Sequence, residues 1–192
     1  MSAIVIFLRA ASLLTFVGPM LLMGVSRRTA GLRARAGEGG GHRAPLAANL
    51  AAFGVFFPSL VIFSGSSLAS LALPLALSGC LLAVAGTALV LRSRAELGPS
   101  WSLVPKADRS TGLVITGPYR LVRHPIYLGL ALLAVGQALA FASWPAFFIV
   151  VFGIVPTFAR RALAEDELLA RTFGERFEIY RRRTRMIIPL LF

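Results

Sequence analysis

Four residues within five consecutive positions, Arg123, His124, Pro125 and Tyr127, make up the segment of this sequence best suited to bind an anion. Proline fits the first position of a helix, which makes His124 the helix cap and places Arg123 just before it. Free backbone N–H groups, the positive end of the helix and a guanidinium group then converge, so we expect an anion site. Taken singly, Arg123 could instead be a membrane anchor, His124 a solvated cap and Tyr127 an interfacial aromatic residue.

Two adjacent acids, Glu165 and Asp166, form the second segment with chemical potential. Arg161 lies four positions before Glu165, so these two residues could form nothing more than an ion pair on a helix surface. A carboxylate opposite an anion site would also suit a ligand that carries both signs of charge. S-adenosylmethionine is such a ligand, because it has a carboxylate, an ammonium group, a sulfonium group and ribose hydroxyls.

The composition places these residues in a membrane protein. Of the 192 residues, 57% are hydrophobic and 15% charged, whereas soluble domains have about 45–50% and about 25%. The apolar residues come in blocks close to the roughly 20 residues that a helix needs to cross a bilayer. We therefore expect an all-α integral membrane fold with about five transmembrane helices. The expected apolar segments are 3–25, 45–63, 68–91, 126–142 and, after a break at 143–145, a segment that runs to 158.

The second half of the chain is expected to hold the chemistry. Its two apolar segments are short, so they could span with local thinning of the bilayer or form a re-entrant helical hairpin. From Ala159 to about Arg183, apolar residues keep helical spacing within a charged stretch, which predicts an amphipathic helix at the cytoplasmic surface. Residues 1–95 would then be three N-terminal transmembrane helices on the scaffold or acceptor side, and residues 96–192 the core that carries the motifs.

The basic residues set the orientation and exclude nucleic acid as the leading partner. The net charge is +12, but all Lys and Arg except Arg9 lie in three segments between apolar blocks, and the two outer turns have none. This positive-inside pattern places the N-terminus outside and the three basic segments in the cytoplasm. The single cysteine, Cys80, excludes a disulfide framework or a thiolate metal cluster, so no metal is expected. The preference for Arg over Lys favours a bacterial inner membrane.

Short motifs follow one another through the C-terminal half, from about Leu97 to Pro189. They are Leu97-Gly98 with Trp101-Ser102, Leu113-Val114, Gly117-Pro118-Tyr119-Arg120, residues 123–129, Glu165-Asp166, Leu169, Phe173-Gly174, Phe177, Tyr180 and Ile188-Pro189. With this ordered set, the C-terminal half resembles the isoprenylcysteine carboxyl methyltransferase family and its relatives, the membrane phospholipid methyltransferases. Two mild departures from the family pattern are Asp166, where Glu is usual, and Phe177, where Tyr is common.

The resemblance implies an S-adenosylmethionine-dependent membrane methyltransferase with a cytoplasm-facing cofactor pocket. The lipophilic acceptor would enter from the lipid bilayer, and Arg123 and Glu165 are the expected catalytic residues, with Arg123 orienting an anionic group through bidentate bonds. The residues expected to bind the cofactor are Tyr119, Arg123, His124, Pro125, Tyr127, Glu165 and Asp166.

The acceptor and even the reaction class stay open at this point. Carboxyl O-methylation of the isoprenylcysteine type is the first expectation, and phospholipid, amine or thiol methylation are alternatives. A non-catalytic membrane module, a small transporter, or a protein similar to membrane sterol reductases could use the same helices. Binding of S-adenosylmethionine separates these classes.

The basic segments generate a test of topology. Cysteines placed at Gly40 and near Thr184 should be protected from a membrane-impermeant thiol reagent added to intact cells, because both positions belong to the cytoplasmic side. Permeabilised cells should label at both positions. Labelling of either cysteine from outside would overturn the orientation.

Overall fold

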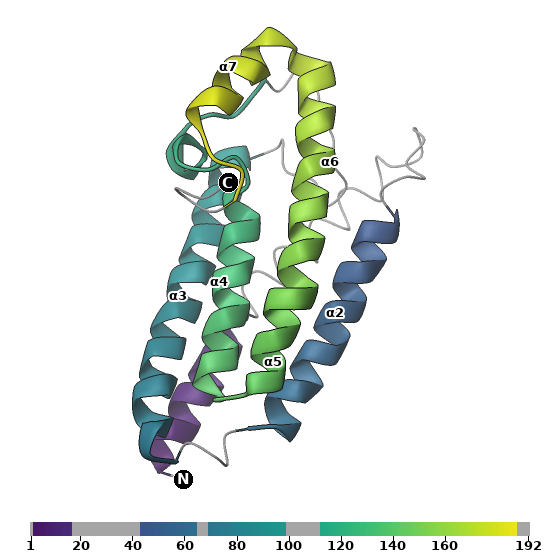
Figure 1. Cartoon of the computed structure of the whole chain (residues 1–192). Helices are drawn as coiled ribbons and strands as arrows, with labels where there is room; N and C mark the ends of the chain where they lie inside the picture. Colours follow the sequence, from purple (N-terminus) through teal and green to yellow (C-terminus); the bar gives the residue numbers. More distant parts are fainter. Residues whose placement is uncertain (1, 17–42, 65–68, 99–111, 188–192) are drawn as a thin grey trace.

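The computed structural model describes residues 2–16, 43–64, 69–98 and 112–187, and within these ranges the regular structure is helical (Figure 1). The all-α prediction is therefore confirmed. The helices are an N-terminal helix (Ala3–Phe16), α2 (Arg43–Ile62), α3 (Ala72–Leu97), α4 (Pro125–Ala140), α5 (Trp144–Ile149), α6 (Val155–Phe173) and α7 (Glu175–Arg183). Shorter turns are the 3-10 turns η2 (Ala69–Leu71) and η4 (Gly117–Arg120) and the π-turn η5 (Val150–Ile154).

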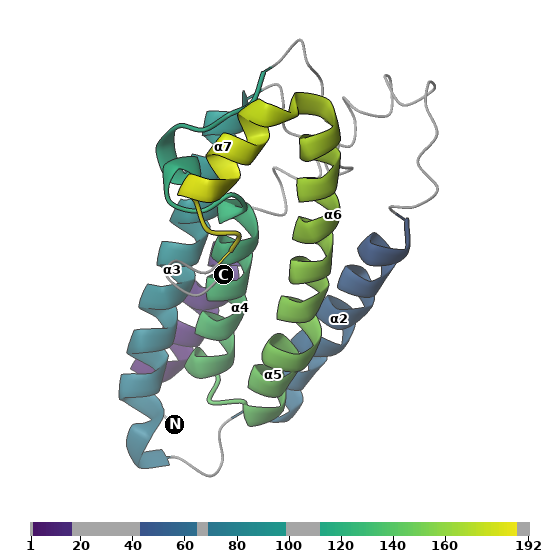
Figure 2. The ribbon, with the colours of Figure 1, turned by 45° about the horizontal axis from the view of Figure 1, so that its top comes forward.

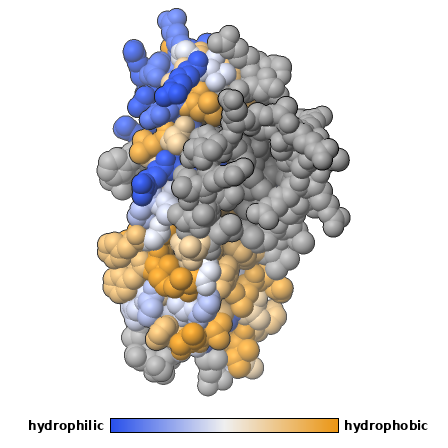
Figure 3. All heavy atoms as spheres, turned by 90° about the vertical axis from the view of Figure 1, so that its right-hand side faces the viewer, coloured by the Kyte–Doolittle hydropathy of each residue, from blue (hydrophilic) through white to orange (hydrophobic). Residues whose placement is uncertain are grey.

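Long apolar helices lie side by side and leave the charged residues at one end. Two helices, Ala72–Leu97 and the continuous Trp144–Phe173, are long and apolar enough to cross a membrane, and Ala3–Phe16, Ala51–Ile62 and Pro125–Ala140 are shorter apolar helices. Figures 1 and 2 show that these helices lie side by side, with α7 across one end. Figure 3 shows hydrophilic surface over that end and hydrophobic surface below it. Of the expected first span, the part after Phe16 lies outside the described residues, as do Trp101, Ser102, Ile188 and Pro189.

Glycines allow α3 and α4 to touch backbone to backbone. A Cβ added at Gly79 would lie 2.5 Å from the carbonyl oxygen of Gly136, and one added at Gly86 would lie 2.5 Å from that of Gly129. A Cβ at Gly136 would lie 2.5 Å from the backbone nitrogen of Ala83. Small residues at such contacts are how helices associate where lipid removes the hydrophobic driving force. We call these four glycines the glycine seam; it holds α4 against α3 from the Gly86–Gly129 contact to the Gly79–Gly136 contact.

Arg9 explains why a charge interrupts the first apolar segment. Its side chain is buried and donates through Nε to the carbonyl oxygen of Ala140 at 3.0 Å and through Nη2 to that of Phe141 at 3.3 Å. These carbonyls belong to the last turn of α4, where the helix itself provides no donors. Arg9 thus caps α4 and ties the N-terminal helix to the end opposite the charged one.

The structure corrects one predicted boundary. The charged stretch expected as a separate amphipathic helix over 159–183 is continuous with the last apolar segment, then breaks at Gly174, whose φ is +55°. Glycine adopts this conformation without strain, so it ends the helix. Pro156 does not break the helix between its apolar and charged parts. The π-turn η5 just before it shifts the backbone hydrogen bonds, which accommodates a residue that has no N–H group.

The glycine seam predicts an asymmetric effect of alanine. Gly136→Ala should lower the free energy of unfolding by about 1–3 kcal/mol, because the new methyl group meets backbone atoms that cannot rotate away. Gly54→Ala is the matched control, since nothing lies within 4 Å of its added Cβ and alanine favours a helix over glycine by about 1 kcal/mol. Thermal unfolding in detergent measures both variants. Equal melting temperatures would refute the seam.

Candidate functional site

The predicted site residues meet at the charged end, where α4 begins, with α6 beside it and α7 lying across this end (Figure 2). Pro125 is the first residue of α4 and His124 is its N-cap, as predicted. The His124 side chain is only 5% exposed and makes no capping hydrogen bond. The interpretation of His124 as a solvated cap is therefore wrong, since its ring points into the protein.

Both nitrogens of the His124 ring face carboxylates of α6. Nε2 lies 2.8 Å from Oδ1 of Asp166, and Nδ1 lies 3.4 Å from Oε2 of Glu165. Burial alone lowers the pKa of His124, but the hydrogen bonds and negative charges of Asp166 and Glu165 outweigh it, so the pKa of the imidazole is raised. The two carboxylates thus favour the protonated form of the ring.

The Arg123 guanidinium group binds other residues of the protein. Nε and Nη2 each lie 3.0 Å from Oδ2 of Asp166, and Nη1 donates to the carbonyl oxygens of Arg181 and Thr184. The first contact is a charge-assisted pair, and the second satisfies carbonyls at the end of α7. The anion beside Arg123 in this structure is consequently Asp166, and the guanidinium fastens α7 to the start of α4.

The backbone before α4 is also engaged. The N–H groups of Arg123 and His124 donate to the carbonyl oxygens of Arg185 and Met186 at 2.7 and 3.0 Å, and Val122 forms a parallel bridge with Arg185. The sequence predicted free N–H groups at this helix start, whereas these two are bonded. The extended residues that follow α7 supplied the partners, and no pattern in the sequence pointed to that pairing.

Glu165 is the more accessible of the two acids. Its side chain is 22% exposed, against 7% for Asp166. The Tyr127 hydroxyl donates to its Oε1, and Nε of Arg161 donates to the same oxygen at 3.3 Å. The ion pair expected at this spacing is present, but it lies against the Tyr127 ring, with the Arg161 guanidinium carbon 5.8 Å from the ring centroid.

Aromatic packing and Tyr119 complete the surroundings. The Tyr127 ring stacks between His124 and Phe158, with centroid distances of 5.7 and 5.3 Å. Tyr119 is buried in η4, and its carbonyl oxygen accepts a hydrogen bond from the Tyr180 hydroxyl at 2.7 Å. Tyr119 therefore joins η4 to α7. Phe158 was missed by the sequence analysis, because an aromatic residue in an apolar run carries no distinguishing signal.

Comparison with known proteins gives one family and several relatives. The phospholipid methyltransferase family profile matches residues 75–176, which include most of α3, all of α4 and both acids. The chain is 31% identical over 137 residues to a protein-S-isoprenylcysteine O-methyltransferase of Saccharomyces cerevisiae, covering 70% of this chain and 56% of the relative. It is 35% identical over 101 residues to the nickel-cobalt-cadmium resistance protein NccN of Alcaligenes xylosoxydans xylosoxydans, covering 50% and 46%. The chain spans about half the length of the curated relatives it matches.

The raised pKa of His124 predicts a pH-dependent stability. Below the ordinary pKa of histidine, about 6.5, the protonated His124 ring contributes its full stabilisation of the folded state. As the pH rises from there through the raised pKa of the folded state, only the folded protein keeps the proton, so stability falls. The melting temperature in detergent should drop over this range. His124→Gln should remove most of that slope, and parallel curves for the two proteins would contradict the assignment.

Proposed function

Because this chain belongs to the phospholipid methyltransferase family, we propose that it transfers a methyl group from S-adenosylmethionine to a lipophilic acceptor in the bilayer. The observation that carries the proposal is the accessible Glu165 beside the buried ion cluster of Arg123, His124 and Asp166. A carboxyl acceptor of the isoprenylcysteine type is our first proposal, in keeping with the name of the Saccharomyces cerevisiae relative. Phospholipid, amine and thiol acceptors are alternatives, the first in keeping with the description of the family.

The Glu165 carboxylate suits a cofactor that carries a cationic amine. Glu165 accepts one close hydrogen bond from Tyr127 and a longer one from Arg161 at Oε1, and its Oε2 lies 3.4 Å from Nδ1 of His124. A carboxylate has about four acceptor positions, so Glu165 retains capacity for an ammonium group. We therefore propose Glu165 as the residue that binds the cofactor's ammonium group.

The remaining predicted residues would position the site. Asp166 has both oxygens engaged, so it holds His124 and Arg123 in place. A ligand carboxylate could bind Arg123 only by displacing Asp166, which makes Arg123 primarily a positioning residue in this proposal. Pro125 starts the helix that carries His124, and Tyr127 orients Glu165. Tyr119, the last of the set, holds η4 against α7.

The chemistry asks little of acids or bases. When bound, S-adenosylmethionine supplies a methyl group already activated by its sulfonium. The protein then has to hold the acceptor in line and exclude water, which a rigid, buried cluster at the end of apolar helices favours. A lipophilic acceptor would bring its head to this level while its chain stays in lipid.

We also propose the finer topology of about five spans. The apolar helices Ala3–Phe16, Ala51–Ile62 and Pro125–Ala140 would span together with the two longer ones, with the N-terminus outside. The cluster lies at the end that carries the basic residues of α7, so the cofactor would enter from the cytoplasm.

Substitution of Glu165 tests cofactor binding directly. Glu165→Gln should weaken S-adenosylmethionine binding to the purified protein by about 10- to 150-fold, the loss expected when one hydrogen bond to a charged group is removed. Glu167→Gln is the matched control: Glu167 lies two positions along on α6, is 73% exposed, and should keep wild-type affinity. Isothermal titration calorimetry measures both.

Two outcomes would contradict the proposal. Wild-type affinity in well-folded Glu165→Gln would place the cofactor elsewhere, and absence of binding in the wild type would favour the non-catalytic or reductase-like alternatives. Transfer itself is followed by mass spectrometry of membranes for species heavier by the mass of one methylene group.

A further inference from the structure

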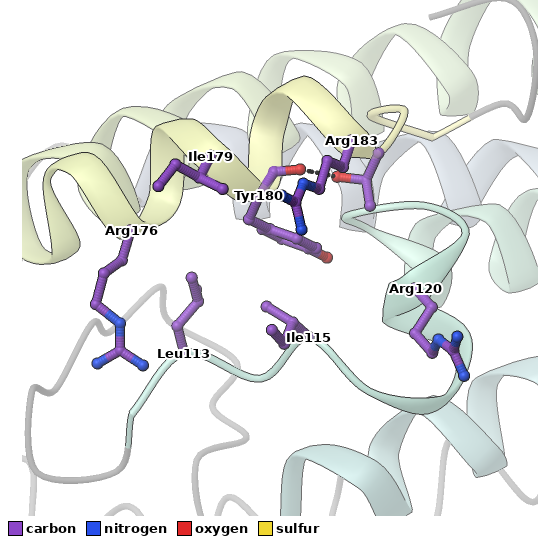
Figure 4. A pocket seen from close by; sticks show the side chains of 8 residues that line it. Leu113, Ile115, Arg120, Arg176, Ile179, Tyr180 and Arg183 are labelled. Atoms are coloured by element: carbon purple, nitrogen blue, oxygen red, sulfur yellow. Dashed lines mark hydrogen bonds between the residues drawn. The ribbon is translucent and has the colours of Figure 1, made fainter.

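A cavity lies beyond the ion cluster, between α7 and the chain before η4. The cavity has a volume of about 350 Å³, within the range of ligand-binding pockets. Its lining residues are Leu113, Ile115, Arg120, Arg176, Ile179, Tyr180, Arg183 and Thr184, shown in Figure 4. None of them is among the residues proposed above to bind S-adenosylmethionine.

The wall formed by α7 is one continuous helix face. Arg176, Ile179, Tyr180 and Arg183 are spaced by three, four and seven positions from the first, so their side chains share a side of the helix. Figure 4 shows Arg176 at one end of the cavity and Arg120 at the other, with Arg183 above. The cavity is thus lined along its length by cationic groups.

The three arginines are available to an external anion. Arg120, Arg176 and Arg183 are exposed, and within the ranges that the structure describes none of them forms an ion pair with a carboxylate. Neighbouring exposed arginines differ in this respect, since Arg171 and Arg181 pair with glutamates of their own helices. Unpaired guanidinium groups around a cavity attract phosphate or carboxylate.

Apolar side chains from both walls also line the cavity. Ile115 from the loop and Ile179 from α7 are 48% and 46% exposed and face the cavity with Leu113. A free inorganic anion gains nothing from isoleucine side chains. An amphiphile with an anionic head would match both the arginines and these apolar side chains.

We propose that this cavity binds the head group of an anionic phospholipid of the cytoplasmic leaflet. The phosphate would lie among Arg120, Arg176 and Arg183, and the glycerol and first chain segments would contact the isoleucines. Basic groups at this leaflet are attracted to its negative lipids, so the location at the charged end of the spans supports the same occupant. The inference uses the membrane orientation proposed above but not methyl transfer.

Lipid binding to the full protein in detergent tests the proposal. Native mass spectrometry with phosphatidylglycerol should show one tightly bound lipid, and phosphatidylcholine should bind at least about tenfold more weakly. The triple variant R120Q/R176Q/R183Q should lose phosphatidylglycerol affinity by about tenfold or more. Its affinity for S-adenosylmethionine should stay unchanged, which keeps this test separate from that of the proposed function.

Matched controls distinguish the cavity from net charge and from a free anion. R160Q/R171Q/R182Q removes the same charge from exposed positions outside the cavity and should keep lipid affinity within about twofold. Equal losses in the two triple variants would overturn the proposal. Displacement of the lipid by inorganic phosphate at comparable concentration would also overturn it, in favour of a site for soluble anions.

Discussion

Burial of the Asp166 carboxylate is the constraint on which the charged end of this protein depends. An ionised carboxylate removed from water is strongly destabilising unless it is paired and hydrogen-bonded. Here Arg123 and His124 supply that pairing from the start of α4, and Arg123 also holds the carbonyls that end α7. Three elements distant in sequence are therefore fixed by one acid, and Glu165, its neighbour, is left partly exposed beside a rigid support.

The apolar part of the molecule makes that support possible. The glycine seam brings α3 and α4 into backbone contact, and Arg9 secures the opposite end of α4. A helix held at both ends and along one side presents His124 and Tyr127 at a defined height relative to α6. Precise placement of this kind is what methyl transfer from an activated donor would require of a protein, because orientation supplies most of the rate.

The sequence predicted the helical class, the start of α4 at Pro125 and the meeting of the two motif segments, because each rests on a local rule. Proline at a first helical position and apolar runs of membrane length are such rules. It did not predict that Asp166 and the residues after α7 would occupy the expected anion site, since this depends on tertiary pairing between distant segments. The glycine seam could have been predicted from the sequence. Gly79 and Gly86, like Gly129 and Gly136, are seven positions apart, which places each pair on one face of its helix.

The pairing of residues 122–124 with residues 185–186 also sets an order of assembly during biosynthesis. The segment that completes the cluster is translated after every apolar helix of the described chain. In the orientation proposed above, Arg123, His124 and the two acids would stay on the cytoplasmic side while the helices enter the membrane, so each charge would be solvated until the cluster forms. The ion cluster that joins α4, α6 and α7 therefore forms last, after the helices of the described chain have been made.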